Sequence, residues 1–175
     1  MPVFLTGLPV HVLIVHAVVV LVPLAVVGAT IVAVWPAARR RYGWLTVGLT
    51  ALAAACVPIA TGSGEDLRDR LVPTDLIRTH AQLGDELLVF VLALLILLAA
   101  LVTVDHRRGR NAAKAALEQA EPTRGPRAIV LGLALLTVGF AVTSGVQVVR
   151  IGDSGARAAW AETHYVAPAP HKGQG

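Results

Sequence analysis

The feature that most constrains the fold is a long apolar run near the N-terminus, residues 8–30, LPVHVLIVHAVVVLVPLAVVGAT. Because about 20 apolar residues are enough for a helix to cross a bilayer, this run predicts a membrane span. It nevertheless contains His11, His16 and Pro23. Imidazoles are costly inside hydrocarbon, so an ionisable side chain within a span is by default a candidate for function. The two histidines are therefore candidate functional residues.

Composition extends the membrane assignment to the whole chain. It is 55% hydrophobic and only 15% charged, whereas soluble domains are about 25% charged. The apolar residues fall in four runs, which predicts an all-α polytopic membrane protein with four transmembrane helices in an antiparallel bundle. We expect a single domain over residues 1–160 and a disordered tail over residues 161–175. The predicted spans are residues 10–35, 44–60, 83–104 and 128–149.

The segments between the spans carry further local signals. Gly62 and Gly64 are expected to end the second helix, and residues 111–120 are expected to form a short surface helix. Residues 152–155, Gly-Asp-Ser-Gly, match the string around a serine-protease nucleophile. That chemistry needs a rigid oxyanion hole and a positioned base, so a turn beside the membrane is the favoured interpretation.

Several classes of protein are excluded by the cysteine and charge content. The single Cys56 rules out an intrachain disulfide and Cys-based zinc or iron–sulfur motifs. A pI near 10 would suggest nucleic acid for a soluble protein. Here the basic residues flank spans, and the basic loop 107–127 has no interleaved aromatic residues. Membrane topology and contact with anionic lipid explain this charge better.

The distribution of basic residues predicts the orientation. The segments after the first and third spans carry nine Lys and Arg residues, and the three opposite segments carry six. Under the positive-inside rule, both termini then lie outside the cytoplasm. We expect a multi-pass protein of the inner (plasma) membrane.

This topology gathers ionisable residues on the outer side. His11 and His16 lie about 140° apart around a helix, so they do not form an i, i+4 metal pair. The third span descends from the same side, so we expect His11 to lie level with His80, and His16 level with Asp85 or Glu86. The outer-side residues are His11, His16, Glu65, Asp66, His80, Asp85, Glu86 and His164.

Three interpretations of this cluster remain open. In the first, His80 and either His11 or His16 ligate one b-type haem from different helices. In the second, His11, His80, Glu65 and Asp85 supply a divalent-metal site. In the third, hydrogen bonds satisfy the histidines, which only hold the bundle together.

Four further segments are informative together: LPVHVLIVHAVVVLVPLA (8–25), TGSGEDL (61–67), HAQLG (80–84) and GDSGARAAW (152–160). With these segments the chain resembles the bacterial transmembrane family "domain of unknown function two-two-three-one". Some members of that family of four-helix membrane domains are fused to Rieske-type iron–sulfur domains. The resemblance implies membrane redox chemistry, haem with His11, His16 and His80 as candidate ligands, and a Rieske-type partner. We therefore expect an electron-transfer or accessory protein rather than a stand-alone enzyme, the alternative being a non-catalytic scaffold subunit.

Overall fold

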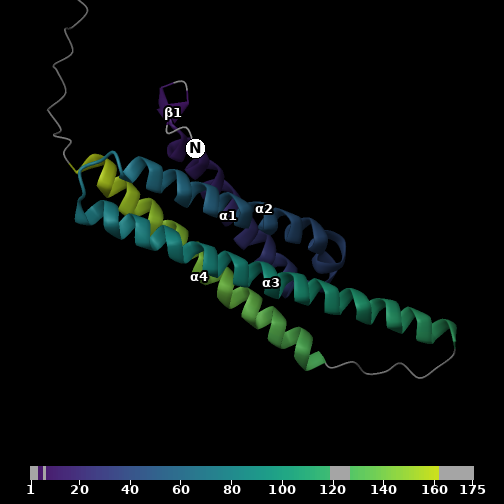
Figure 1. The fold of residues 1–175 in the computed structure, drawn as a ribbon. Coiled ribbons are helices and arrows are strands. Elements are labelled where there is room, and N and C mark those ends of the chain that lie inside the picture. The colour runs from purple at the N-terminus through teal and green to yellow at the C-terminus, as the bar shows by residue number, and fades with distance from the viewer. Residues whose placement is uncertain (1–3, 6, 119–126, 162–175) are drawn as a thin grey trace, which may run out of the picture.

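Four long helices make up almost all of the structure (Figure 1). The structure is a computed structural model that describes residues 4–5, 7–118 and 127–161. The helices are α1 (Val10–Val34), α2 (Pro36–Arg68), α3 (Asp75–Leu117) and α4 (Arg127–Trp160). This confirms the predicted all-α architecture with four helices.

A small hairpin precedes the bundle. Its strands, β1 (Phe4–Leu5) and β2 (Leu8–Pro9), pair antiparallel. Gly7 lies in the turn with a φ of 85°, a left-handed conformation that glycine adopts without steric cost. The hairpin leads directly into α1.

The helices form an antiparallel bundle in which α1 and α3 each pack against both α2 and α4. Trp35 alone separates α1 from α2, with an extended backbone at φ −116° and ψ 104°. Pro36 follows at the first position of α2, where proline loses no hydrogen bond because that N–H has no partner within the helix. The first two helices are therefore joined by a very tight turn.

The interior of the bundle is packed mainly by aliphatic side chains. On α3, Leu94, Leu98 and Leu101 are fully buried, at the i, i+4, i+7 spacing of one helix face. On α1, Val22, Ala25 and Ala29 are fully buried at the same kind of spacing. Lipid tails are as apolar as these side chains, so close van der Waals contact between the two faces, rather than removal from water, stabilises the bundle.

The outer surface of the bundle is apolar as well. Each of the four helices contains an 18-residue window with a mean hydropathy between 1.7 and 3.3. Large aliphatic side chains such as Val20, Val89 and Leu135 are at least 64% exposed. Such a surface suits lipid, where helices satisfy their backbone hydrogen bonds internally. The protein is therefore a multi-pass membrane protein.

Three local predictions about helix ends were wrong. The second helix does not end at Gly62 and Gly64, because α2 runs on to Arg68. Residues 111–117 continue α3 rather than forming a separate surface helix, and residues 152–155 are helical within α4 rather than forming a turn. A glycine inside a helix costs only about 1 kcal/mol, which tertiary packing can offset. The predicted disordered tail lies outside the described residues from 162 onward.

Candidate functional site

His11 lies in the first turn of α1 and is fixed by the neighbouring helix α2. Its Nδ1 lies 2.9 Å from the carbonyl oxygen of Ala60. Because a carbonyl oxygen can only accept, Nδ1 carries the hydrogen and donates it. In the neutral ring, this tautomer leaves the lone pair on Nε2.

His80 lies in the second turn of α3 and is fixed in the same way by α4. Its Nδ1 lies 3.2 Å from the carbonyl oxygen of Ile151 and 3.1 Å from Oγ of Ser154. The Ser154 hydroxyl donates its own hydrogen to the Ile151 carbonyl, so it accepts from the ring. The Nδ1–H of His80 is therefore shared between two acceptors, and its Nε2 also carries the lone pair.

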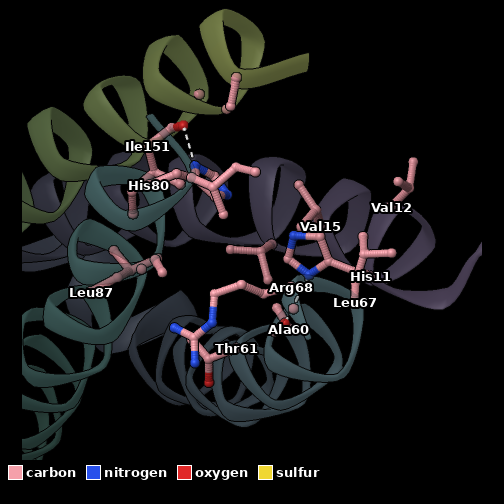
Figure 2. A pocket seen from close by; sticks show the side chains of 18 of the residues that line it. His11, Val12, Val15, Ala60, Thr61, Leu67, Arg68, His80, Leu87 and Ile151 are labelled. Atoms are coloured by element: carbon pink, nitrogen blue, oxygen red, sulfur yellow. Dashed lines mark hydrogen bonds between the residues drawn. The ribbon is translucent and has the colours of Figure 1, made fainter. Parts of the chain in front are cut away.

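The two rings face each other across the interior of the bundle. Their centroids are 6.2 Å apart and their planes are nearly perpendicular, at 84°. Figure 2 shows the rings of His11 and His80 pointing toward one another, with their hydrogen-bonded carbonyls on the far sides. No hydrogen bond in the described part of the chain engages either Nε2 atom. This confirms the prediction that His11 lies level with His80.

A glycine lies against each ring. A Cβ added at Gly64 would lie 2.9 Å from Cε1 of His11, and one added at Gly155 would lie 2.9 Å from Cε1 of His80. Both distances are shorter than the roughly 3.5–4.0 Å of good carbon–carbon contact. Only glycine therefore lets each ring approach its helix closely enough to reach the carbonyl one turn earlier.

The two supporting helices use the same local pattern. In α2 the acceptor Ala60 is followed by a serine at i+3 and a glycine at i+4, within the string ATGSG. In α4 the acceptor Ile151 is followed likewise, within IGDSG. Each serine hydroxyl donates to the acceptor carbonyl of its own helix, at 3.0 Å for Ser63 and 2.9 Å for Ser154. The site is thus built from two similar halves, α1 with α2 and α3 with α4.

A cavity of about 440 Å³ surrounds the paired rings. All four helices contribute to its wall, which is mostly apolar, and many of the lining residues are glycine or alanine. Arg68 of α2 also enters the cavity, as Figure 2 shows. Pockets of about 300–1,000 Å³ between the helices of a bundle are common ligand sites. Six of the small lining residues are Ala60, Gly64, Ala81, Gly84, Gly155 and Ala159.

The remaining sequence-predicted residues lie at the edge of this site. His16 lines the same cavity, but its ring is exposed and its Nδ1 donates to the carbonyl of Val12 in its own helix, 2.6 Å away. Glu65 and Asp85 also line the cavity, and both are exposed. Among the described residues there is no group of three or more His, Cys, Asp or Glu that could hold a metal ion. The structure therefore brings His11 and His80 together but does not gather the four proposed metal ligands into one cluster.

Of the other residues predicted on the outer side, Glu86 belongs to a separate hydrogen-bond network. Glu86 accepts a hydrogen bond of 3.0 Å from Nε2 of Gln147, which also donates to the carbonyl of Leu83 at 3.1 Å. Gln147 thereby ties α4 to α3 one to two turns below His80. His164 lies outside the described residues.

Sequence reasoning missed the residues that hold the rings. Gly64, Ser154 and Gly155 were assigned to a helix end and a turn, although each lies within a helix and contacts a histidine. The Ser-Gly dipeptide shared by residues 60–64 and 151–155 is the signal that links them. The number of residues from His11 to the first dipeptide differs from the number from His80 to the second, so a search for a repeat of fixed length does not detect the pattern.

Fold and site together define a four-helix, multi-pass membrane protein with a pair of facing histidines in one end of the bundle. The model of the family described as "Predicted membrane protein (DUF2231)" matches residues 7–168. The chain therefore belongs to this family, as its sequence resemblance predicted. Comparison with curated proteins and with solved structures gives no significant match.

Proposed function

We propose that this protein is a membrane electron-transfer protein that binds one b-type haem, which His11 and His80 would hold. The observation that carries the proposal is the pair of imidazoles facing each other from different helices, each with a free Nε2 lone pair, 6.2 Å between centroids. Two histidines from separate helices are a common way for a membrane helix bundle to hold haem.

The separation of the rings supports a shared metal. A metal–imidazole bond is about 2.0–2.1 Å long, and Nε2 lies about 1.2 Å from the ring centroid, so two rings that would share one metal need centroids no more than about 6.4 Å apart. The observed 6.2 Å agrees with that spacing. Rings in ordinary stacking or edge contact also cover a range of about 4.5–7 Å, so the distance supports the proposal together with the hydrogen bonds behind the rings.

The hydrogen bonds behind the rings support it as well. A ligating histidine usually donates its other ring N–H to a carbonyl or carboxylate, which fixes the tautomer and the ring orientation. The carbonyls of Ala60 and Ile151 serve His11 and His80 in this way. Both rings are thus oriented before any ligand arrives.

The cavity wall suits a large, flat and mostly apolar group. Small lining residues other than Gly64 and Gly155, such as Ala81, Gly84 and Ala159, keep the cavity open, and Arg68 supplies a cation in it. A guanidinium pairs well with a carboxylate, so Arg68 is the residue that would hold the haem propionates. When bound, haem supplies a one-electron redox couple whose potential depends on its axial ligands and on its burial.

The chain's own residues would then orient the group. The proposed orientation, with both termini outside the cytoplasm, places the histidine pair near the outer face of the inner membrane. A redox partner at that face, of the Rieske type that the family resemblance implies, would exchange electrons there. Electron transfer of this kind requires no catalytic residue, so we do not propose an enzyme.

The test is an optical spectrum of the protein purified from haem-supplemented cells, with and without dithionite. We expect a Soret band that is lost in His11→Ala and in His80→Ala. The control is His16→Ala, which should keep the band because His16 is exposed and bonds its own helix. Circular dichroism checks that each variant remains helical.

A colourless protein, still colourless after reconstitution with haem, contradicts the proposal. The two histidines would then only link α1 to α2 and α3 to α4 through their hydrogen bonds. That is the scaffold function expected as the alternative. Metal analysis by mass spectrometry on the same sample tests the divalent-metal site with His11, His80, Glu65 and Asp85.

A further inference from the structure

A second cavity, of about 340 Å³, lies at the opposite end of the bundle from the histidine pair. It is bordered by the turn between α1 and α2, by α3, and by the first turns of α4. Three arginines from three different helices line it: Arg39, Arg108 and Arg127. No acidic residue belongs to its wall in the part of the chain that the structure describes.

Arg39 is the unusual member of this cluster. Its side chain is only 5% exposed, and its Nη2 donates a single bond of 3.3 Å to the carbonyl of Ala33. Its Nε and Nη1 atoms are buried and have no hydrogen-bond partner among the described residues. A buried charge without a counter-ion is strongly unfavourable. A bound anion would therefore stabilise this guanidinium.

The other two arginines strengthen that requirement. Arg108 is half-buried and Arg127 is exposed, and both border the same cavity as Arg39. Like charges that share a low-dielectric cavity repel each other unless an anion lies between them. Guanidinium groups bind phosphate oxygens through paired hydrogen bonds. The cluster therefore has the chemistry of a phosphate site.

The rest of the wall shows what kind of phosphate fits. From Arg127 the cavity continues along α4 beside Val130, Ala134 and Val138, which follow at i, i+4 spacing and so form one apolar stripe. A free phosphate has no apolar part that could contact this stripe. A phospholipid has acyl chains that can pack against the stripe and a headgroup phosphate that can bind the arginines.

We propose that this cavity binds an anionic phospholipid, with its headgroup phosphate on Arg39, Arg108 and Arg127 and an acyl chain along α4. Basic pockets between transmembrane helices bind such headgroups in other membrane proteins. The site is separate from the histidine pair and does not depend on haem.

The experiment is native mass spectrometry of the full chain in a neutral detergent, titrated separately with phosphatidylglycerol and phosphatidylcholine. We expect phosphatidylglycerol to be retained about tenfold more strongly by the wild type than by Arg39→Gln or Arg108→Gln, since each variant loses charge-assisted hydrogen bonds to the phosphate. The matched control is Arg110→Gln. Arg110 is an exposed arginine near Arg108 on α3 and does not line the cavity, so its variant should behave like the wild type.

Several results would overturn the proposal. Equal retention of the two lipids, or equal losses in Arg108→Gln and Arg110→Gln, excludes a specific headgroup site. Displacement of the lipid by millimolar inorganic phosphate identifies a free anion as the occupant instead. Circular dichroism accompanies each variant, and Arg108→Gln, which replaces a half-buried residue, carries the test if Arg39→Gln does not fold.

Discussion

Alanine at Gly64 or Gly155 tests the close contact between each histidine ring and its supporting helix. The new Cβ would lie 2.9 Å from Cε1 of His11 or of His80. Because good carbon–carbon contact begins at about 3.5 Å, each ring must retreat by at least about 0.6 Å. At Gly155 that retreat stretches the bonds from His80 to the Ile151 carbonyl and to Ser154, which are already 3.2 and 3.1 Å long.

The expected effect on stability follows from two opposing contributions. Overpacking of this kind costs about 1–3 kcal/mol. Gly62 and Gly152 are matched controls, because they lie in the same helical segments and an added Cβ meets nothing within 4 Å. At those positions alanine removes the helix penalty of glycine and stabilises by about 0.5–1 kcal/mol. Gly64→Ala and Gly155→Ala gain the same helix propensity, which cancels in the comparison, so they should be about 1–3 kcal/mol less stable than the matched control variants.

The assay is denaturant unfolding in a mild detergent, followed by circular dichroism, for the four variants and the wild type. If Gly155→Ala proves as stable as Gly152→Ala, the His80 ring does not lie against α4, and the site geometry described above is refuted. The same comparison of Gly64→Ala with Gly62→Ala tests the other half of the site independently.

Two further predictions concern the ring acceptors and the topology. Ser154→Ala should lose about 0.5–1.5 kcal/mol of stability because the His80 ring loses a hydrogen-bond acceptor. Ser63→Ala should lose less, because among the described residues the Ser63 hydroxyl bonds only the Ala60 carbonyl of its own helix. Equal losses of stability in unfolding experiments would contradict the hydrogen bond assigned between Ser154 and His80. A reporter enzyme that is active only outside the cytoplasm should be active when fused after Gly175, and activity of a cytoplasmic reporter alone at that position would reverse the predicted orientation.

The spans were predictable from the sequence because long apolar runs leave few structural choices. The level of His11 against His80 was also predictable, since the antiparallel order places both near the same end of the bundle and a helix rises by about 1.5 Å per residue. That expectation needed no side-chain detail. It is the part of the candidate site that the hydropathy pattern alone determines.

The supports of the rings were not predictable by the same reasoning. The acceptors at Ala60 and Ile151 are backbone carbonyls, which no residue type marks in a sequence. Gly64 and Gly155 resemble helix-ending glycines, and their purpose emerges only from the distances to the histidine rings. A glycine needed for close approach and a glycine that ends a helix carry the same letter, so packing has to distinguish them.

The positions of the two cavities relate both proposals to the membrane. From His11, at the first cavity, to Ala33, at the second, α1 rises about 33 Å, close to the roughly 30 Å of bilayer hydrocarbon. The aliphatic core, including Leu94 and Leu98, lies between them. With no polar connection described across this core, we expect the two sites to act independently. Arg108→Gln should leave any haem spectrum unchanged, and His80→Ala should leave lipid retention unchanged. A change of either signal in the other site's variant would instead show that the helices couple the two ends.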